Sequence, residues 1–343
     1  MRGRSLLLGV ALAGVSCGAL SACATPAESE QVSAPPEAPV AVEPEAETSA
    51  TSPAPRAAVD LPIDRLASGH LIVPFAVGDE ELAFVLDSGA STTVITPSTR
   101  DRMGIAPDAG QLVQASGANG QLAGVRVVSL PAGRIQDRDY APLTAAVMDL
   151  SHLEDSIERR IDGILGRNFL IQHEVEIDFP AERLRLHDPG AMASGSLDAG
   201  GLLATDYGSF PAGLIRIDVR LDGGEAFPAV FDLGAARSVL NWHAARAAGL
   251  DPAAAGEQTG PGEELLGADD RPLAARVHRF ESIELGALRF DGPTLHVADL
   301  AVFETLGVAE GPAMVFGIDL LGDRRVVIDY PGERLLVSPP PAA

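Results

Sequence analysis

Two aspartates in matching surroundings are the residues of this chain best suited to carry out chemistry together. Asp87 follows an apolar run and opens the segment Asp-Ser-Gly-Ala, and Asp232, 145 positions later, opens Asp-Leu-Gly-Ala. Two carboxyl groups held about 3 Å apart cannot comfortably both ionise, so they share a proton. The ionised carboxylate accepts a proton from a bound water, while the protonated carboxyl donates a hydrogen bond to the developing oxyanion. The pair therefore predicts hydrolysis by an activated water, with Asp87 and Asp232 as the catalytic residues.

The residues that follow each aspartate predict an active-site loop that supports the carboxylate. Glycine lets the backbone approach closely and supplies N–H donors to the carboxylate. Alanine, the next residue, offers no hydroxyl that would stabilise the ionised aspartate and lower its pKa. We therefore expect activity at weakly acidic to neutral pH rather than at strongly acidic pH. The supporting residues are Ser88, Gly89 and Ala90 in the first copy and Leu233, Gly234 and Ala235 in the second.

The two aspartates lie within a duplicated unit of the chain. Residues 72–105 align with residues 217–250 without a gap, and a second pair of blocks aligns at a slightly larger offset. The larger offset adds six residues between the blocks in the second copy, and an insertion of this kind belongs in a loop. The second blocks are the apolar-apolar-glycine segments Ile164, Leu165 and Gly166 and their counterparts Val315, Phe316 and Gly317.

Short strands separated by turn signals dominate the sequence from residue 61 onward, with few helical stretches. Leu71 to Val77 and Leu82 to Leu86 have the apolar pattern of strands. Thr96 to Met103 predicts a short helix, and Asn241 to Ala248 predicts its counterpart in the second copy. The pattern predicts an all-β fold of two homologous lobes, each of a comfortable domain size. The N-terminal lobe is assigned to residues 61–190, the connector to 191–206 and the C-terminal lobe to 207–340.

With these motifs, the chain resembles the retropepsin-like aspartic peptidase family over residues 65–338. Phe84 to Ile95 fits the family's active-site signature, and both apolar-apolar-glycine segments resemble those that thread beneath the active-site loop. The resemblance implies two homologous acid protease lobes related by pseudo-twofold symmetry, with one catalytic aspartate from each. Members are either homodimers of one lobe or fused pairs of lobes, and this chain resembles the fused form. A monomer that cleaves peptide or unfolded protein substrates is expected.

Leu233 is the main departure from the family's pattern. The resemblance implies that the hydroxyl after each catalytic aspartate bonds the active-site loop of the opposite lobe. Ser88 can form this bond, whereas the side chain of Leu233 has no donor. Three alternatives follow: the enzyme works with one such brace, the second lobe is degenerate, or two first lobes pair within an oligomer. The competing functions are a catalytically inactive peptide- or protein-binding module and an envelope scaffold.

A glycine-rich stretch between the first active-site loop and Ile164 predicts a flap over the substrate. Its glycines suit the mobile tip of a hairpin that excludes water on closure. An ordinary surface loop is the alternative. A counterpart in the second lobe is expected around residues 260–270. The predicted flap residues are Ser116, Gly117, Ala118, Asn119 and Gly120.

The amino-terminal segment predicts export to a bacterial cell envelope. Arg2 and Arg4 precede a short apolar run, and Leu20-Ser21-Ala22-Cys23 resembles a bacterial lipobox. We therefore assign residues 1–22 to a lipoprotein signal peptide and expect lipid on Cys23, with simple cleavage of the signal as the alternative. Residues 23–60, rich in Pro, Ala and Glu, predict a disordered acidic tether. By resemblance to the enterobacterial lipoprotein sorting pattern, Ala24 after the cysteine favours the periplasmic face of the outer membrane.

The composition excludes several classes of function. The formal net charge is −23 and the chain contains no lysine, which excludes P-loop and Schiff-base chemistry and makes nucleic acid a poor partner. Both cysteines, Cys17 and Cys23, lie near the amino terminus, so the rest of the chain has no thiolate metal site. The scattered histidines are interpreted as surface or satisfied core residues, and the repeated Asp178 and Asp329 as turn formers. No metal or cofactor is expected.

Overall fold

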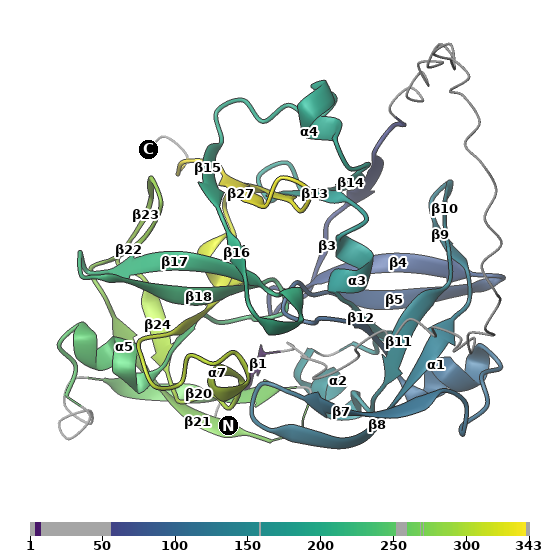
Figure 1. Cartoon of the computed structure of the whole chain (residues 1–343), viewed down its shortest axis with the longest axis horizontal. Coiled ribbons are helices and arrows are strands. Elements are labelled where there is room, and N and C mark those ends of the chain that lie inside the picture. Colours follow the sequence, from purple (N-terminus) through teal and green to yellow (C-terminus); the bar gives the residue numbers. More distant parts are fainter. Residues whose placement is uncertain are drawn as a thin grey trace, which may run out of the picture.

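The protein consists of two lobes side by side and a sheet that joins them, as the computed structural model shows (Figure 1). The structure describes residues 4–7, 56–157, 159–251, 259–267, 269 and 271–340. Strands dominate both lobes, and the described helices are all short. The predicted all-β architecture of two repeated lobes is therefore confirmed.

The first lobe is built on a ten-stranded sheet with three short helices. Its elements are β3 (Asp64–Arg65), β4 (Leu71–Val77), β5 (Glu80–Leu86), β6 (Thr93–Ile95), α1 (Pro97–Arg102), β7 (Gln111–Ser116), β8 (Gln121–Leu130), β9 (Gly133–Ile135), β10 (Arg138–Tyr140), β11 (Leu143–Val147), α2 (Ser151–Ile157), β12 (Gly163–Leu165) and α3 (Arg167–Leu170). Strand β12 pairs in parallel with β5 and antiparallel with β6. It therefore threads between the strand before Asp87 and the strand after it.

The second lobe repeats this arrangement around Asp232. Its elements are β16 (Gly208–Ser209), η1 (Pro211–Gly213), β17 (Ile215–Leu221), β18 (Ala226–Asp232), β19 (Val239–Leu240), α5 (Trp242–Ala247), β20 (Gly260–Gly267), β21 (Leu273–Arg279), β22 (Ser282–Leu285), β23 (Leu288–Asp291), β24 (Thr294–Val297), α7 (Val302–Thr305), β25 (Met314–Gly317) and η3 (Ile318–Leu320). Strand β25 pairs in parallel with β18 and antiparallel with β19. It is thus the counterpart of β12.

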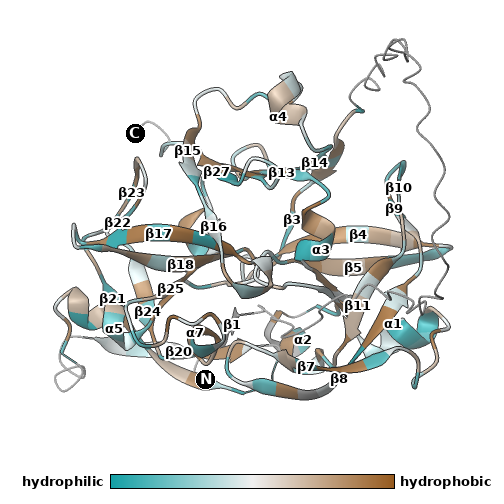
Figure 2. Ribbon diagram, in the orientation of Figure 1, coloured by the Kyte–Doolittle hydropathy of each residue, from teal (hydrophilic) through white to brown (hydrophobic). Residues whose placement is uncertain are grey.

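Alternating apolar residues place the core against the strands that lead to the aspartates. Figure 2 shows hydrophobic segments along β4 and β17, and in β17 buried residues alternate regularly with exposed ones. Phe84 and Phe231, on the strands that run into the two active-site loops, are fully buried. Burial of such large side chains stabilises the fold by about 2 kcal/mol each and holds the start of each loop in place.

The repeat differs by one residue from the gapless alignment of the sequence. Val73 pairs with Phe84 in the first lobe, and Ile217 pairs with Ala229 in the second. Ten residues separate the first pair and eleven the second, so the hairpin turn between β17 and β18 is one residue longer. The prediction that residues 72–105 match 217–250 without a gap is therefore wrong before this turn, because a turn tolerates an extra residue that a strand does not.

A six-stranded sheet joins the two lobes and was not predicted. Its order is β15 (Leu203–Asp206), β27 (Arg334–Val337), β26 (Arg325–Asp329), β13 (Glu174–Asp178), β14 (Arg183–His187) and β2 (Val59–Pro62). At its centre β13 of the first lobe pairs antiparallel with β26 of the second. Glu176 accepts hydrogen bonds here from His187 and from Arg325 of the second lobe. Against the effect of burial, these partners lower the pKa of Glu176 to about 2.

Two of the assigned boundaries differ from the structure. Val59 and Asp60, assigned to the tether, belong to β2 and pair with β14. The assigned connector, residues 191–206, contains the short helix α4 (Ala191–Ser194) and β15, which pairs with β27. The connector is therefore part of the central sheet. The sequence of β15 has no turn signal or apolar pattern that would predict its pairing with β27.

Only part of the predicted envelope segment can be placed. Residues 8–55, which include Cys23 and most of the predicted tether, lie outside the described residues. Within the predicted signal peptide, β1 (Arg4–Leu7) pairs in parallel with β20 of the second lobe. None of the helices in the described part of the chain is both long and apolar enough to cross a bilayer.

Candidate active site

The glycine-ended segments lie directly beneath the two active-site loops. Arg167 N, just after β12, donates to Ala90 O at 2.7 Å, and Ile318 N, just after β25, donates to Ala235 O at 2.9 Å. A Cβ on the glycine that ends either segment would approach backbone atoms of the loop closer than 3.0 Å. Only glycine allows this packing, which explains the repeated apolar-apolar-glycine pattern.

The structure brings Asp87 and Asp232 together between the lobes. Asp87 is fully buried and Asp232 is 6% exposed. Their carboxyl groups lie within hydrogen-bonding reach of each other. Each loop glycine packs against the aspartate of the opposite lobe, because a Cβ on Gly89 would overlap the carboxyl group of Asp232 and one on Gly234 that of Asp87. The predicted pseudo-symmetric pair is therefore present within a single chain.

Backbone N–H groups support each carboxylate from its own loop. Gly89 N and Ala90 N donate to Asp87 Oδ1 at 2.7 and 3.0 Å, and Gly234 N donates to Asp232 Oδ1 at 2.8 Å. Asp87 Oδ2 is buried and has no N–H or O–H donor of its own among the described residues. A proton on this oxygen, shared with the carboxylate of Asp232, would satisfy it.

Burial raises the pKa of both aspartates, and the charge of Asp232 raises that of Asp87 further. For Asp87, burial comes first and the negative charge of Asp232 second, and together they raise the pKa well above its usual range. Burial also raises the pKa of Asp232, while hydrogen bonds from Asp87 and from the loop backbone partly offset the effect. The two groups titrate as a pair, so the pair holds one proton at a pH where ordinary carboxyl groups have lost theirs.

The hydroxyl of Ser88 links the two active-site loops. Ser88 Oγ donates to Phe231 O at 3.0 Å and accepts from Leu233 N at 2.9 Å. The side chain of Leu233 is buried and cannot return these bonds. The absence of a hydroxyl at position 233 does not separate the two loops, because Asp232 still meets Asp87.

The predicted flap is the tip of the hairpin β7–β8, and it is docked on the second lobe. Gly117 N donates to Gly120 O at 2.8 Å across the tip. Asn119 N donates to Asp269 Oδ2 at 2.6 Å, and Ala118 O accepts from Val302 N at 3.0 Å. Ser116, at the end of β7, is buried. The stretch is therefore neither a free tip nor an ordinary surface loop in this conformation.

The counterpart of the flap in the second lobe is the hairpin of β20 and β21. Residues 260–267 of the predicted range 260–270 form β20. The connection to β21 follows Gly267. A bulge between Pro261 and Glu264 accommodates the proline and glycines within the strand.

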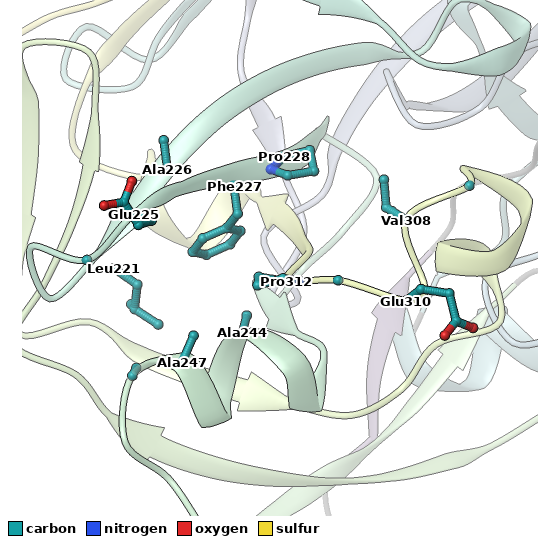
Figure 3. A pocket seen from close by; sticks show the side chains of 14 residues that line it. Leu221, Glu225, Ala226, Phe227, Pro228, Ala244, Ala247, Val308, Glu310 and Pro312 are labelled. Carbon is teal, nitrogen blue, oxygen red and sulfur yellow. The ribbon is translucent and has the colours of Figure 1, made fainter.

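An apolar cavity of about 510 Å³ lies away from the two aspartates. It is bounded by the start of β18, by α5 and by the segment that precedes β25 (Figure 3). Its lining includes Phe227, Pro228, Ala244, Ala247, Val308 and Pro312. Neither aspartate contributes to this lining, so the cavity is not where the pair would act.

His70 contacts the second active-site loop, a role that its sequence surroundings do not indicate. From the sequence, the histidines are interpreted as surface or satisfied core residues. The structure places His70 Nε2 3.0 Å from Gly234 O, in a fully buried position. The only signal was its position just before the duplicated block, where the second copy has a leucine. Recognition required the correct alignment across the longer turn.

One comparison with known proteins agrees with the two-lobe repeat. The aspartyl protease family model matches residues 73–169 and again residues 217–320, once in each lobe. A retropepsin-like aspartic protease from Rickettsia conorii is similar to the chain, with 17% identity over 38% of this chain and 90% of that protein, at a TM-score of 0.30. No curated protein matches the chain. Because the family model covers more than half of the residues, the chain belongs to the aspartyl protease family.

Proposed function

We propose that this protein is an aspartic endopeptidase whose reaction centre is the pair Asp87 and Asp232. One observation carries the proposal: two buried carboxyl groups from homologous loops meet, each supported by backbone N–H donors of its own loop. Membership of the aspartyl protease family supports peptide-bond hydrolysis. A docked flap favours a substrate that is an extended peptide or an unfolded protein, because a folded domain cannot enter beneath it.

The reaction needs one proton on the pair. We assign this proton to Asp87, because its buried Oδ2 has no N–H or O–H donor of its own among the described residues, and Asp232 is then the ionised member. Asp232 accepts a proton from a water whose oxygen attacks the scissile carbonyl carbon, while Asp87 donates its proton to the carbonyl oxygen. When the tetrahedral intermediate collapses, the C–N bond breaks, the amine nitrogen takes the proton from Asp232, and the oxygen returns its proton to Asp87. Water and peptide are consumed, and the pair ends as it began.

The pH dependence of cleavage tests this proposal. Activity should vanish below the pH at which Asp232 gains a proton and above the pH at which the pair loses its last one. Because burial raises the pKa of both groups above 3.8, both limbs should lie at higher pH than for ordinary carboxyls, with a maximum between weakly acidic and neutral pH. The measurement is kcat/KM on an unfolded protein, with and without a statine peptide that mimics the tetrahedral intermediate.

The outcomes of this assay are distinct. A bell-shaped profile that the statine peptide abolishes supports the proposed function. A maximum below about pH 3 would contradict the raised pKa values. Binding of the statine peptide without cleavage at any pH would instead indicate the inactive peptide-binding module.

We further propose that lipid on Cys23 holds the protein at the periplasmic face of a bacterial outer membrane. The proposal rests on the order of charged, apolar and lipobox residues in the first 23 positions and on Ala24. Labelled palmitate should enter the wild type and the variant Cys17→Ser, whose lipobox is intact, but not Cys23→Ser. Label in Cys23→Ser would refute the assignment, and absence of label from all three would indicate simple cleavage of the signal.

A further inference from the structure

A turn of the first lobe reaches the second lobe beside its active-site loop. The turn precedes β4 and spans Leu66 to His70, with Leu66 N donating to His70 O at 2.9 Å and Gly69 N donating to Leu66 O at 2.8 Å. Just before it, Arg65 Nη1 donates to Gly322 O of the second lobe at 3.4 Å. The backbone of the turn is therefore held in a fixed shape at the boundary between the lobes.

The imidazole of His70 ends on a backbone carbonyl of the second lobe. Its Nε2 lies 3.0 Å from Gly234 O and its Nδ1 lies 2.8 Å from Ser68 Oγ. A carbonyl oxygen only accepts, so Nε2 must carry a proton, and in the neutral ring Nδ1 then accepts from the serine hydroxyl. Burial lowers the pKa of His70 to about 4, so the ring is neutral at weakly acidic to neutral pH.

The position of Gly234 determines how the two carboxyl groups meet. Its N–H donates to Asp232 Oδ1 at 2.8 Å, and a Cβ on it would overlap the carboxyl group of Asp87. Its carbonyl oxygen is the atom that His70 bonds. A bond to this carbonyl fixes the peptide plane that follows a glycine, the residue with the widest backbone freedom.

The second lobe has the same turn but cannot return this bond. Phe210 N donates to Leu214 O at 2.8 Å and Gly213 N donates to Phe210 O at 3.0 Å, the pattern of hydrogen bonds that closes the first turn. Leu214 therefore takes the place of His70. Its side chain is buried and has no donor.

Two side chains of the first lobe form hydrogen bonds with the second active-site loop. Ser88 bonds the second lobe's loop before Asp232 and at Leu233, and His70 bonds the same loop after Asp232. Both side chains belong to the first lobe. Leu233 lacks the hydroxyl that would act in the opposite direction, and His70 adds a side-chain hydrogen bond to those of Ser88 on this loop.

We propose that His70 is a positioning residue that compensates for the hydroxyl missing at Leu233 by holding the second active-site loop from the first lobe. It touches neither the substrate nor the reacting carboxyl groups and acts through Gly234. The inference rests on the proposed function, because a positioning role requires a reaction. The contact itself is a property of the fold, so part of its test is independent of activity.

The tautomer of His70 tests the contact without an assay. In protein labelled with 15N-histidine at neutral pH, the ring should be neutral with its proton on Nε2. The variant His70→Leu identifies the resonances by their loss. A proton on Nδ1 and a bare Nε2 would overturn the proposal, because a bare nitrogen cannot donate to Gly234 O.

Kinetics test the positioning role. His70→Leu gives the first turn the residue that the second turn already has. We expect kcat to fall on the order of 10- to 100-fold while KM changes less than about twofold, since the loop's misplacement affects the reacting geometry more than substrate contacts. His70→Gln keeps an N–H donor and should retain more than about a third of the wild-type kcat.

Leu233→Thr provides a rescue. Its hydroxyl mirrors that of Ser88 and can reach Leu86 O and Ser88 N, by symmetry with the bonds to Phe231 O and Leu233 N. In the His70→Leu background it should raise kcat at least about threefold, but in the wild type less than about twofold. Equal effects in both backgrounds would refute the idea that one contact compensates for the other.

His173→Leu is the matched control. His173 is also buried, its Nδ1 lies 3.2 Å from the backbone carbonyl of His187, and burial likewise lowers its pKa to about 4. This variant should be less stable than the wild type but have the same kcat. If its kcat fell as much as that of His70→Leu, His70 would have only a structural role. If the wild type cleaves nothing, the proposed function fails. The contact between His70 and Gly234 is then tested separately, by the tautomer of His70 and by the same double-mutant cycle measured as unfolding free energy.

Discussion

Asp87→Asn and Asp232→Asn, made separately, should each lower kcat/KM by about 10³-fold or more. An asparagine can neither accept the proton of the attacking water nor share a proton with the remaining carboxyl. Each variant keeps the oxygen that accepts the loop N–H bonds, so the loop should stay in place. The measurement is cleavage of an unfolded protein at the pH of the wild-type maximum.

The matched control for these variants is Asp178→Asn. Asp178 Oδ1 accepts from Ala181 N at 3.0 Å in the turn between β13 and β14, and an asparagine keeps this acceptor. Its activity should equal that of the wild type. Loss of activity only in Asp87→Asn would support pairing of two first lobes, and full activity in both dyad variants would end the case for this pair.

The same variants should show an effect on stability that depends on pH. A carboxyl group whose pKa is higher in the folded protein than in the unfolded chain lowers the free energy of unfolding as the pH rises from its unfolded pKa to its folded pKa. Asp87 is such a group. Asp87→Asn should therefore unfold at a higher temperature than the wild type at pH 7, with a smaller difference at pH 4. A melting temperature lower than that of the wild type at pH 7 would contradict the raised pKa.

Gly89→Ala and Gly234→Ala should be the next most damaging changes, with a loss of activity of about 10²-fold or more. A Cβ at either position would overlap the carboxyl group of the opposite lobe's aspartate. The loops must move apart to relieve the overlap, which separates the two carboxyl groups. Overpacking of this kind also costs about 1–3 kcal/mol of stability. Activity and thermal unfolding would be measured together.

Gly208→Ala is the control for the glycine variants. A Cβ on Gly208 would meet no atom within 4 Å, and the residue is exposed in β16. It should leave both activity and the unfolding temperature unchanged. If Gly234→Ala also retained full activity, the close approach of its backbone to Asp87 would not be required for catalysis.

Local chemistry explains what the sequence could predict. The helix caps are an example: Thr96 Oγ1 accepts from Thr99 N at 3.1 Å and Asn241 Oδ1 accepts from Ala244 N at 2.9 Å. The caps, the strand-to-aspartate loops and the turn at Asp178 each depend on residues within a few positions of one another. Duplication then doubled the signal, because the same local pattern occurred twice.

Long-range pairing explains what the sequence could not predict. Strand β13 carries no sign that its neighbour is β26, about 150 residues away, rather than a strand of its own lobe. The docking of Asn119 on Asp269 and the bond of His70 to Gly234 are contacts of the same kind. Asn119 and His70 are polar residues whose neighbours in the sequence form no recognisable motif with them, so only the folded chain shows their roles.

The pairing of β13 with β26 has a consequence for how the reaction centre forms. An enzyme made of two separate copies must wait for an encounter, and its centre falls apart on dilution. Here a covalent connection and a shared row of backbone bonds fix the effective concentration of each half around the other. The number of assembled Asp87–Asp232 pairs therefore equals the number of folded molecules, however dilute the protein is.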